Sequence, residues 1–148
     1  MIKTTFETQL DKSKPSKPRI LIVDDNLELL EELDTMLTLG GYDVLALNDG
    51  TQVFDIALKN KPDLILLDLK MGPKTGFQIA DEIRHSLLLK ETPILAMTGF
   101  YTEKQHSLLM KICGIKTCVL KPFRPINLIT KIEYALGNRF QEHDSDGT

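Results

Sequence analysis

The sequence has few of the residues that mark specialised classes of protein. It contains two cysteines, Cys113 and Cys118, and no tryptophan, and only 6% of its 148 residues are aromatic. Two cysteines make no disulfide framework, and no histidine stands near them in the sequence to complete a zinc site. We interpret both as small apolar residues.

Basic charge and long hydrophobic runs are also missing. A formal net charge of −3 provides no basic field, so we expect no direct contact with nucleic acid. No apolar run approaches the roughly 20 residues of a membrane span, and the N-terminus lacks the apolar region of a signal peptide. The expected location is therefore cytoplasmic, without membrane contact.

The length and the distribution of polar residues predict one domain with two flexible ends. Residues 1–17 are expected to form a flexible N-terminal arm, because 12–18 is a polar stretch interrupted by prolines. Residues 138–148 are expected to form a flexible C-terminal tail. The domain itself should span residues 18–137, which is enough for one hydrophobic core.

Short apolar strands alternate with amphipathic helices through this domain. The predicted strands are residues 19–23, 42–47, 63–67, 93–97 and 117–120. The predicted helices are at about 27–39, 51–58, 76–86, 102–113 and 125–137; Asn26 should cap the first, and Leu87 should lie on the apolar face of the third. This alternation predicts an α/β fold with a doubly wound, five-stranded parallel sheet, and a flavodoxin-like order 2-1-3-4-5 is the expected one.

A polar residue stands at the end of four of these strands. Asp24 and Asp25 follow the first strand and Asp68 follows the third. Thr98 follows the fourth and Lys121 the fifth. Because ligands of such sheets bind outside the carboxyl ends of the strands, we expect these side chains to meet at one edge.

Three neighbouring carboxylates repel one another and need compensating cations. The ammonium group of Lys121 is one, and a divalent ion with oxygen ligands would be another: Mg²⁺, with Mn²⁺ as a possible substitute. A carboxylate nucleophile beside a metal ion, a lysine and the Thr98 hydroxyl is the outline of a phosphoryl-transfer site.

Each of these residues also has an ordinary structural explanation when taken singly. Asp24 and Asp25 could cap a helix, Asp68 and Thr98 could belong to turns, and Lys121 could be a solvated surface residue. If all of these explanations were correct, the polar residues after four strands would lie at one edge of the sheet by coincidence. A shared site is therefore favoured.

The segments 20–25, 64–71 and 119–123 give the chain a family resemblance. Their sequences, ILIVDD, LILLDLKM and VLKPF, closely resemble those of the receiver domain of response regulators in two-component signalling. The resemblance covers residues 19–136. It implies the CheY-like form of the fold and a phosphorylation-controlled signalling switch.

Roles for individual residues follow from this resemblance. Asp68 would be the phosphoacceptor, and Mg²⁺ would be held by Asp24, Asp25, Asp68 and the backbone carbonyl of Lys70. Thr98 and Lys121 would contact the phosphoryl group. The Lys121–Pro122 peptide bond is expected to be cis.

The resemblance also implies partners. A histidine kinase or histidine phosphotransfer protein would donate the phosphoryl group and dock near residues 26–34. A downstream effector would bind the face formed by the fourth helix, the fifth strand and the fifth helix.

The output activity would lie on another chain or a missing module. The chain itself would be no enzyme beyond its own phosphotransfer and autodephosphorylation. Kinase, output and oligomeric state remain open.

The sequence departs from the family at Cys118, where an aromatic ring that moves with the threonine is usual. Phe100 or Tyr101 could relay the change instead.

An alternative function is a receiver-like interaction module that works without phosphorylation. A phosphohydrolase of the haloacid dehalogenase type is disfavoured, because its nucleophile follows the first strand rather than the third.

Overall fold

The structure is a computed structural model that describes residues 17–99 and 104–145. The predicted arm, residues 1–17, therefore lies outside the described residues except for Lys17, and so do Phe100 and Tyr101. The strands are β1 (Arg19–Val23), β2 (Asp43–Leu47), β3 (Leu64–Asp68), β4 (Ile94–Thr98) and β5 (Thr117–Leu120). The helices are α2 (Leu27–Leu39), the short 3₁₀ helix η2 (Gly50–Gln52), α3 (Val53–Asn60), α4 (Gly76–Arg84), α5 (Lys104–Ile112) and α6 (Pro125–Ser145).

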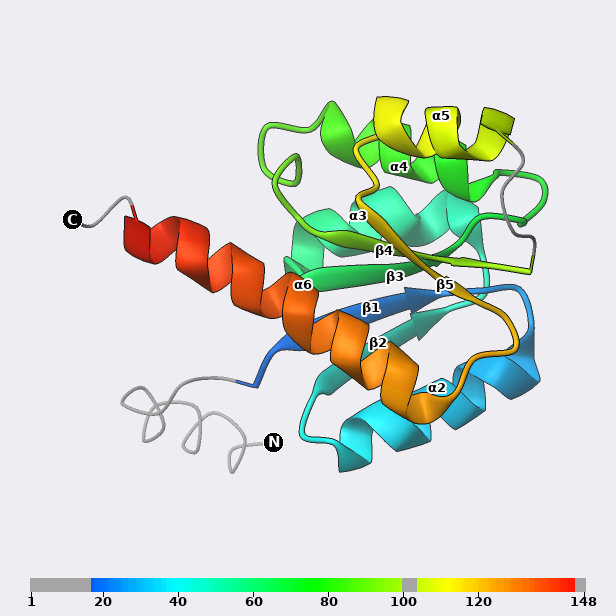
Figure 1. Cartoon of the computed structure of the whole chain (residues 1–148). Coiled ribbons are helices and arrows are strands. Elements are labelled where there is room, and N and C mark those ends of the chain that lie inside the picture. Colours follow the sequence, from blue (N-terminus) through cyan, green and yellow to red (C-terminus); the bar gives the residue numbers. More distant parts are fainter. Residues whose placement is uncertain (1–16, 100–103, 146–148) are drawn as a thin grey trace.

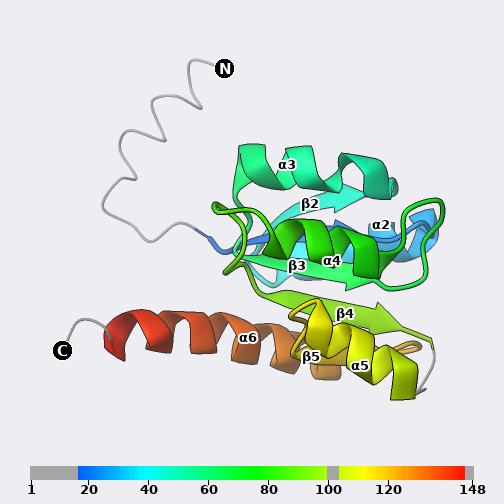
Figure 2. The same cartoon turned by 90° about the horizontal axis from the view of Figure 1, so that it is seen from above.

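The five strands form one parallel sheet in the order β2-β1-β3-β4-β5. Helices α3, α4 and α5 cover one face of the sheet, and α2 and α6 cover the other (Figures 1 and 2). The predicted fold class and strand order are confirmed. All predicted strands agree with the observed ones to within one residue.

Apolar side chains alternate between the two faces of the sheet and build two cores. Leu21, Ile65 and Ala96 pack toward α3, α4 and α5. Ile22 and Leu66 pack toward α2 and α6. The central strands are buried on both faces, which explains why β3 and β4 carry uninterrupted apolar runs.

Turns and caps set the ends of the helices. Asn26 caps α2 by accepting a hydrogen bond from the Leu29 amide, as predicted. Gly41 follows that helix with φ +95°, a backbone conformation that side chains with a Cβ rarely adopt.

Two predictions about helices are wrong. Leu87 was expected on the apolar face of the helix beginning at Gly76, but α4 ends at Arg84 and Leu87 is 86% exposed. The last helix was expected to end near Leu136 and Gly137, whereas α6 continues to Ser145. A single glycine disfavours a helix only modestly, and the following residues have no proline to stop it.

The division of the chain into one domain and two flexible ends stays a prediction.

Candidate functional site

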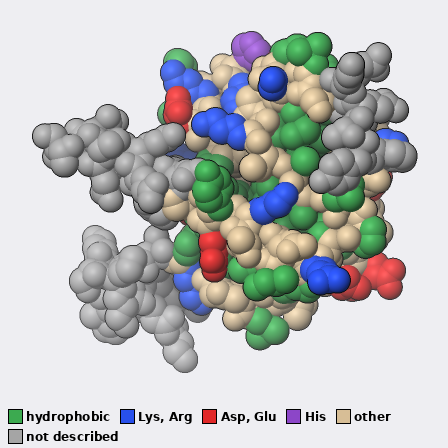
Figure 3. Space-filling view, viewed as in Figure 1, with side chains coloured by type: hydrophobic (Ala, Val, Ile, Leu, Met, Phe, Trp, Pro, Cys, Tyr) green, Lys and Arg blue, Asp and Glu red, His purple; other side chains and the backbone are tan. Residues whose placement is uncertain are grey.

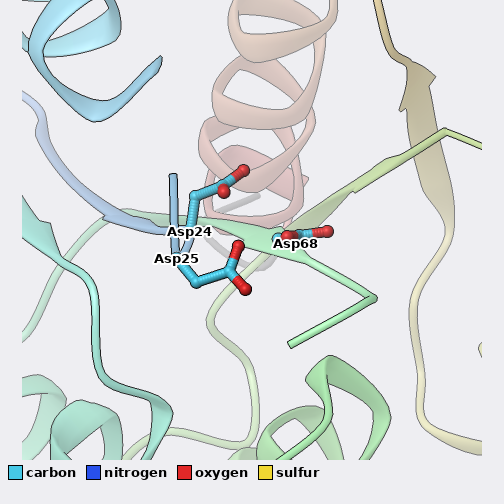
Figure 4. Close-up of side chains that lie close together, drawn as sticks. All are labelled: Asp24, Asp25 and Asp68. Carbon is cyan, nitrogen blue, oxygen red and sulfur yellow. The ribbon is translucent and has the colours of Figure 1, made fainter. Parts of the chain in front are cut away.

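Three carboxylates gather where β1 and β3 end. Asp24 and Asp25 follow the last residue of β1, and Asp68 is the last residue of β3. Each offers one oxygen atom, and these atoms all lie within 4.8 Å of one another (Figure 4). Adjacent pairing of β1 and β3 produces this arrangement, since Val23 pairs with Leu67 directly before the acidic residues.

Asp24 is the most enclosed member of the cluster. It is 0% exposed, and both of its carboxylate oxygens have partners. The backbone amide of Asn26 donates to Oδ1 at 2.9 Å, and the ammonium group of Lys121 donates to Oδ2 at 2.5 Å. A buried charge with a charged hydrogen-bond partner is held in one orientation, so Asp24 has a fixed position at the floor of the site.

Asp68 is buried, and each of its carboxylate oxygens has a partner. It is 4% exposed, its Oδ1 accepts a hydrogen bond from the Lys70 amide at 3.0 Å, and its Oδ2 lies 3.6 Å from Lys121 Nζ. Burial raises the pKa of the Asp68 carboxyl, and the nearby Asp24 and Asp25 raise it further. The Lys70 hydrogen bond and the charge of Lys121 oppose this rise.

Thr98 and Lys121 stand at the same edge. Asp68 pairs with Met97 across β3 and β4, so Thr98 is the next residue along that edge. The Lys121 amide donates to the Thr98 carbonyl oxygen at 2.7 Å, which ties the end of β4 to the segment after β5. The Lys121–Pro122 peptide bond is cis, as predicted. The structure therefore brings the five predicted side chains to one edge of the sheet.

The donor set suits a hard divalent cation. Carboxylate oxygens within 4.8 Å of one another can share such an ion, and the repulsion among them favours binding one. The exposed side of Asp25 leaves the cluster open to solvent. The acidic residues could therefore hold a metal ion.

The sequence did not show how closely the loop after Asp68 packs against its surroundings. Met71 is 4% exposed and packs in the core beside Gly50, where an added Cβ would lie 3.1 Å from the Met71 methyl group. Gly76 opens α4 so close to the acidic cluster that a Cβ there would lie 2.3 Å from the Asp68 carbonyl oxygen. A buried methionine three residues after an acidic strand end was a usable signal for the first of these.

Comparison with known proteins agrees with this geometry. The family described as the response regulator receiver domain matches residues 20–133. The chain belongs to this family. It is the receiver domain of a two-component response regulator.

Individual relatives are distant in sequence and close in structure. The DNA-binding response regulator MtrA of Mycobacterium tuberculosis is 31% identical over 120 residues, which are 81% of this chain and 51% of MtrA. The chemotaxis protein CheY4 of Vibrio cholerae is 28% identical, with a TM-score of 0.76 over 80% of this chain and 98% of CheY4. A CheY-like receiver domain protein of Methanospirillum hungatei is 26% identical, with a TM-score of 0.78 over 86% and 99% of the two chains.

The receiver chain spans about half the length of the curated relatives it matches. Among the described residues, no helix is both long and apolar enough to cross a membrane. The roles of single site residues, the identity of the metal ion, the cytoplasmic location and the absence of nucleic-acid contact remain predictions.

Proposed function

We propose that the receiver domain is a switch that accepts a phosphoryl group on Asp68 from a histidine kinase or a histidine phosphotransfer protein. The observation that carries this proposal is the placement of Asp68 within 4.8 Å of two further carboxylates and 3.6 Å from the Lys121 ammonium group. An acyl phosphate at this position would meet both a metal site and a fixed cation.

The metal ion in this proposal is Mg²⁺, with Mn²⁺ as a substitute. Asp24, Asp25 and Asp68 would hold it, together with the backbone carbonyl of Lys70. When bound, the ion would neutralise the phosphoryl oxygens and the repulsion among the carboxylates.

The chemical step assigns one task to each residue of the site. A carboxylate oxygen of Asp68 forms a bond to phosphorus while the bond from phosphorus to the donor imidazole nitrogen breaks. The electron pair of that bond stays on the imidazole, which then takes up a proton from solvent. Lys121 balances the charge of the phosphoryl oxygens, and the Thr98 hydroxyl donates a hydrogen bond to one of them.

The proposal includes no separate substrate. The domain assists its own phosphorylation and hydrolyses its own acyl phosphate, and its output lies on another chain or another module. The new charge on Asp68 biases an equilibrium between two conformations. An effector would sense this equilibrium on the face formed by α5, β5 and α6, which are the predicted fourth helix, fifth strand and fifth helix.

Intact-mass measurement after incubation with acetyl phosphate and Mg²⁺ tests the proposal. We expect the mass of one phosphoryl group to be added, and this addition should disappear when a chelator removes the metal ion. No added mass in wild-type protein with Mg²⁺ would overturn the proposal.

The second candidate is a receiver-like module that binds partners without phosphorylation. Cys118 favours it, since a thiol replaces the aromatic side chain that usually moves with the threonine. Partner binding that is identical with and without acetyl phosphate, in a protein that takes up no phosphoryl group, would select this candidate.

A further inference from the structure

The loop between β3 and α4, residues 69–75, carries the backbone carbonyl of Lys70, which completes the proposed set of metal ligands. The Lys70 amide donates to Asp68 Oδ1 at 3.0 Å, so the loop begins against the acidic cluster. Lys70 itself is exposed, whereas its neighbours Leu69 and Met71 are 3% and 4% exposed and belong to the core that packs toward α3, α4 and α5. The residue that offers the carbonyl is therefore held between two buried side chains.

Met71 is the anchor for the middle of this loop. Among residues 70–75, all of which the structure describes, it alone is buried. Its terminal methyl group and that of Ile79 on α4 meet at Gly50, where an added Cβ would lie 3.1 Å from the first and 2.9 Å from the second. Because an ordinary contact of this kind is 3.4–4 Å long, a side chain at residue 50 would displace one of these two groups.

Gly50 lies in a turn that is held by its own hydrogen bonds. Asp49 Oδ1 accepts one from the Thr51 amide at 2.9 Å and one from the Thr51 hydroxyl at 2.7 Å. A Cβ at Gly50 would also lie 3.3 Å from the Lys74 carbonyl oxygen, so the turn contacts the backbone of the loop as well as Met71. β1 separates β2 from β3 in the sheet, yet the turn after β2 and the loop after β3 lie side by side (Figures 1 and 2).

The far end of the loop is fixed by separate contacts. Thr75 caps α4, and its side chain and backbone exchange hydrogen bonds with Gln78 in a capping box. The ammonium group of Lys74 forms an ion pair with Glu82 of α4. Between this end and the acidic cluster, the buried contact that holds the loop is the one between Met71 and the Gly50 turn.

We propose that Met71 and Gly50 are positioning residues of the metal site, which hold the Lys70 carbonyl at the acidic cluster and so raise the affinity for a divalent ion. Mg²⁺ requires near-ideal octahedral geometry, and a ligand on a loose loop must first be ordered when the ion binds. Residues that fix a ligand without touching the ion therefore change its affinity. This inference rests on the metal site of the proposed function and adds two residues that do not contact the ion.

Titration of the full chain with Mn²⁺ tests this inference. Free Mn²⁺ gives a sharp electron paramagnetic resonance signal that is lost on binding, so its amplitude gives the dissociation constant. Met71→Ala removes the anchor and should weaken Mn²⁺ binding at least fivefold. Met71→Leu keeps a similar volume and should bind within twofold of wild type. Gly50→Ala displaces the loop from the other side and should weaken binding at least twofold, and it carries the comparison if Met71→Ala does not fold.

Two control variants separate positioning from stability. Leu89→Ala truncates a side chain that is 1% exposed in the same core, but in the segment before β4, at the end of the sheet opposite to the acidic edge. It should lower stability in urea as Met71→Ala does and leave the Mn²⁺ affinity within twofold. Asp25→Asn removes a proposed ligand and should abolish the binding, which locates the counted ion at the cluster.

The Mg²⁺ dependence of phosphoryl uptake gives a second measurement. Uptake from acetyl phosphate by Met71→Ala should be slower than in wild type at limiting Mg²⁺ and should reach the wild-type rate at saturating Mg²⁺. A defect that persists at saturating Mg²⁺ would show that Met71 acts on something other than metal affinity, and would reject the inference.

The remaining outcomes also decide the question. Wild-type affinity in Met71→Ala, or equal weakening in Met71→Ala and Leu89→Ala, would reject the positioning role, and so would Met71→Leu binding as weakly as Met71→Ala. If wild-type protein binds no Mn²⁺, or if Asp25→Asn binds it equally well, the proposed metal site itself fails. That failure is seen without any variant of the loop.

Discussion

The acidic edge between β1 and β3 and the groove between α5 and α6, on the proposed effector face, differ in how closely their side chains are held. The groove has a volume of about 570 Å³, and its lining includes Leu69, Thr98, Met110, Cys118, Leu120 and Lys131. At the acidic edge, Asp24 and Asp68 are buried, and each of their carboxylate oxygens has a hydrogen bond or an ion pair. At the groove, Leu120, Arg124 and Asn127 are exposed, and hydrophobic side chains remain visible across this face with lysine and arginine side chains among them (Figure 3). Groups that perform chemistry need fixed positions, whereas a docking surface needs accessible area.

The two regions nevertheless share a boundary. Lys121 follows β5 directly and reaches Asp24 and Asp68, while its amide binds the Thr98 carbonyl. Thr98 in turn lines the groove. Substitutions of single residues separate the contributions of the two regions.

Asp68→Asn should abolish phosphoryl uptake. The amide cannot attack phosphorus as a carboxylate does, and the neighbouring Asp24 is fully buried with both carboxylate oxygens hydrogen-bonded. Intact-mass analysis after acetyl phosphate treatment measures the result. Asp55→Asn, at an exposed residue of α3, is the matched control and should label like wild type. If Asp68→Asn is labelled as fully as wild type, a residue other than Asp68 is the phosphoacceptor.

Lys121→Ala should slow phosphoryl uptake by at least tenfold, because it removes a cation aimed at the phosphoryl oxygens. It should also lower the free energy of unfolding by about 1–3 kcal/mol, since the buried Asp24 carboxylate loses its charged partner. Urea unfolding and the rate of labelling measure the two effects.

Lys116→Ala removes an exposed lysine at the other end of β5, away from the acidic edge, and serves as the control. An unchanged labelling rate in Lys121→Ala would show that this ammonium group does not act on the phosphoryl group.

Much of this acidic edge could be predicted from the sequence. Asp24, Asp68, Thr98 and Lys121 each follow an apolar run, and parallel strands end at one edge. The groove could not be predicted in this way. Its walls come from α5 and α6, whose separation depends on how side chains pack, and Cys118 became informative only when its neighbours Ala96 and Met110 were known.

The two wrong predictions have a common physical cause. The exposure of Leu87 and the extension of α6 concern segments at the ends of helices, where periodic patterns are weak. α4 ends at Arg84, and the guanidinium group of this residue donates to the carbonyl oxygens of Thr92 and Gly114. Such long-range contacts to backbone groups leave no signal in a local sequence pattern.

Gly76→Ala should lower the free energy of unfolding by about 1–3 kcal/mol, in the range of overpacked sites. A Cβ at residue 76 would lie 2.3 Å from the Asp68 carbonyl oxygen, so the loop that carries Lys70 must shift. Phosphoryl uptake should fall together with stability. Chemical unfolding and labelling measure both quantities, and a variant as stable as wild type would contradict the close approach of α4 to β3.

Gly137→Ala should have the smallest effect and the opposite sign. Residue 137 lies inside α6, and among the described residues no atom beyond its chain neighbours and the nearby backbone of its own helix lies within 4 Å of a Cβ added there. Alanine in a helix interior is favoured over glycine by up to about 1 kcal/mol, so the free energy of unfolding should rise by roughly half that amount or more. Gly41→Ala, at φ +95°, is the contrasting control and should be destabilising. A loss of stability in Gly137→Ala would mean that α6 ends where the sequence pattern placed its end.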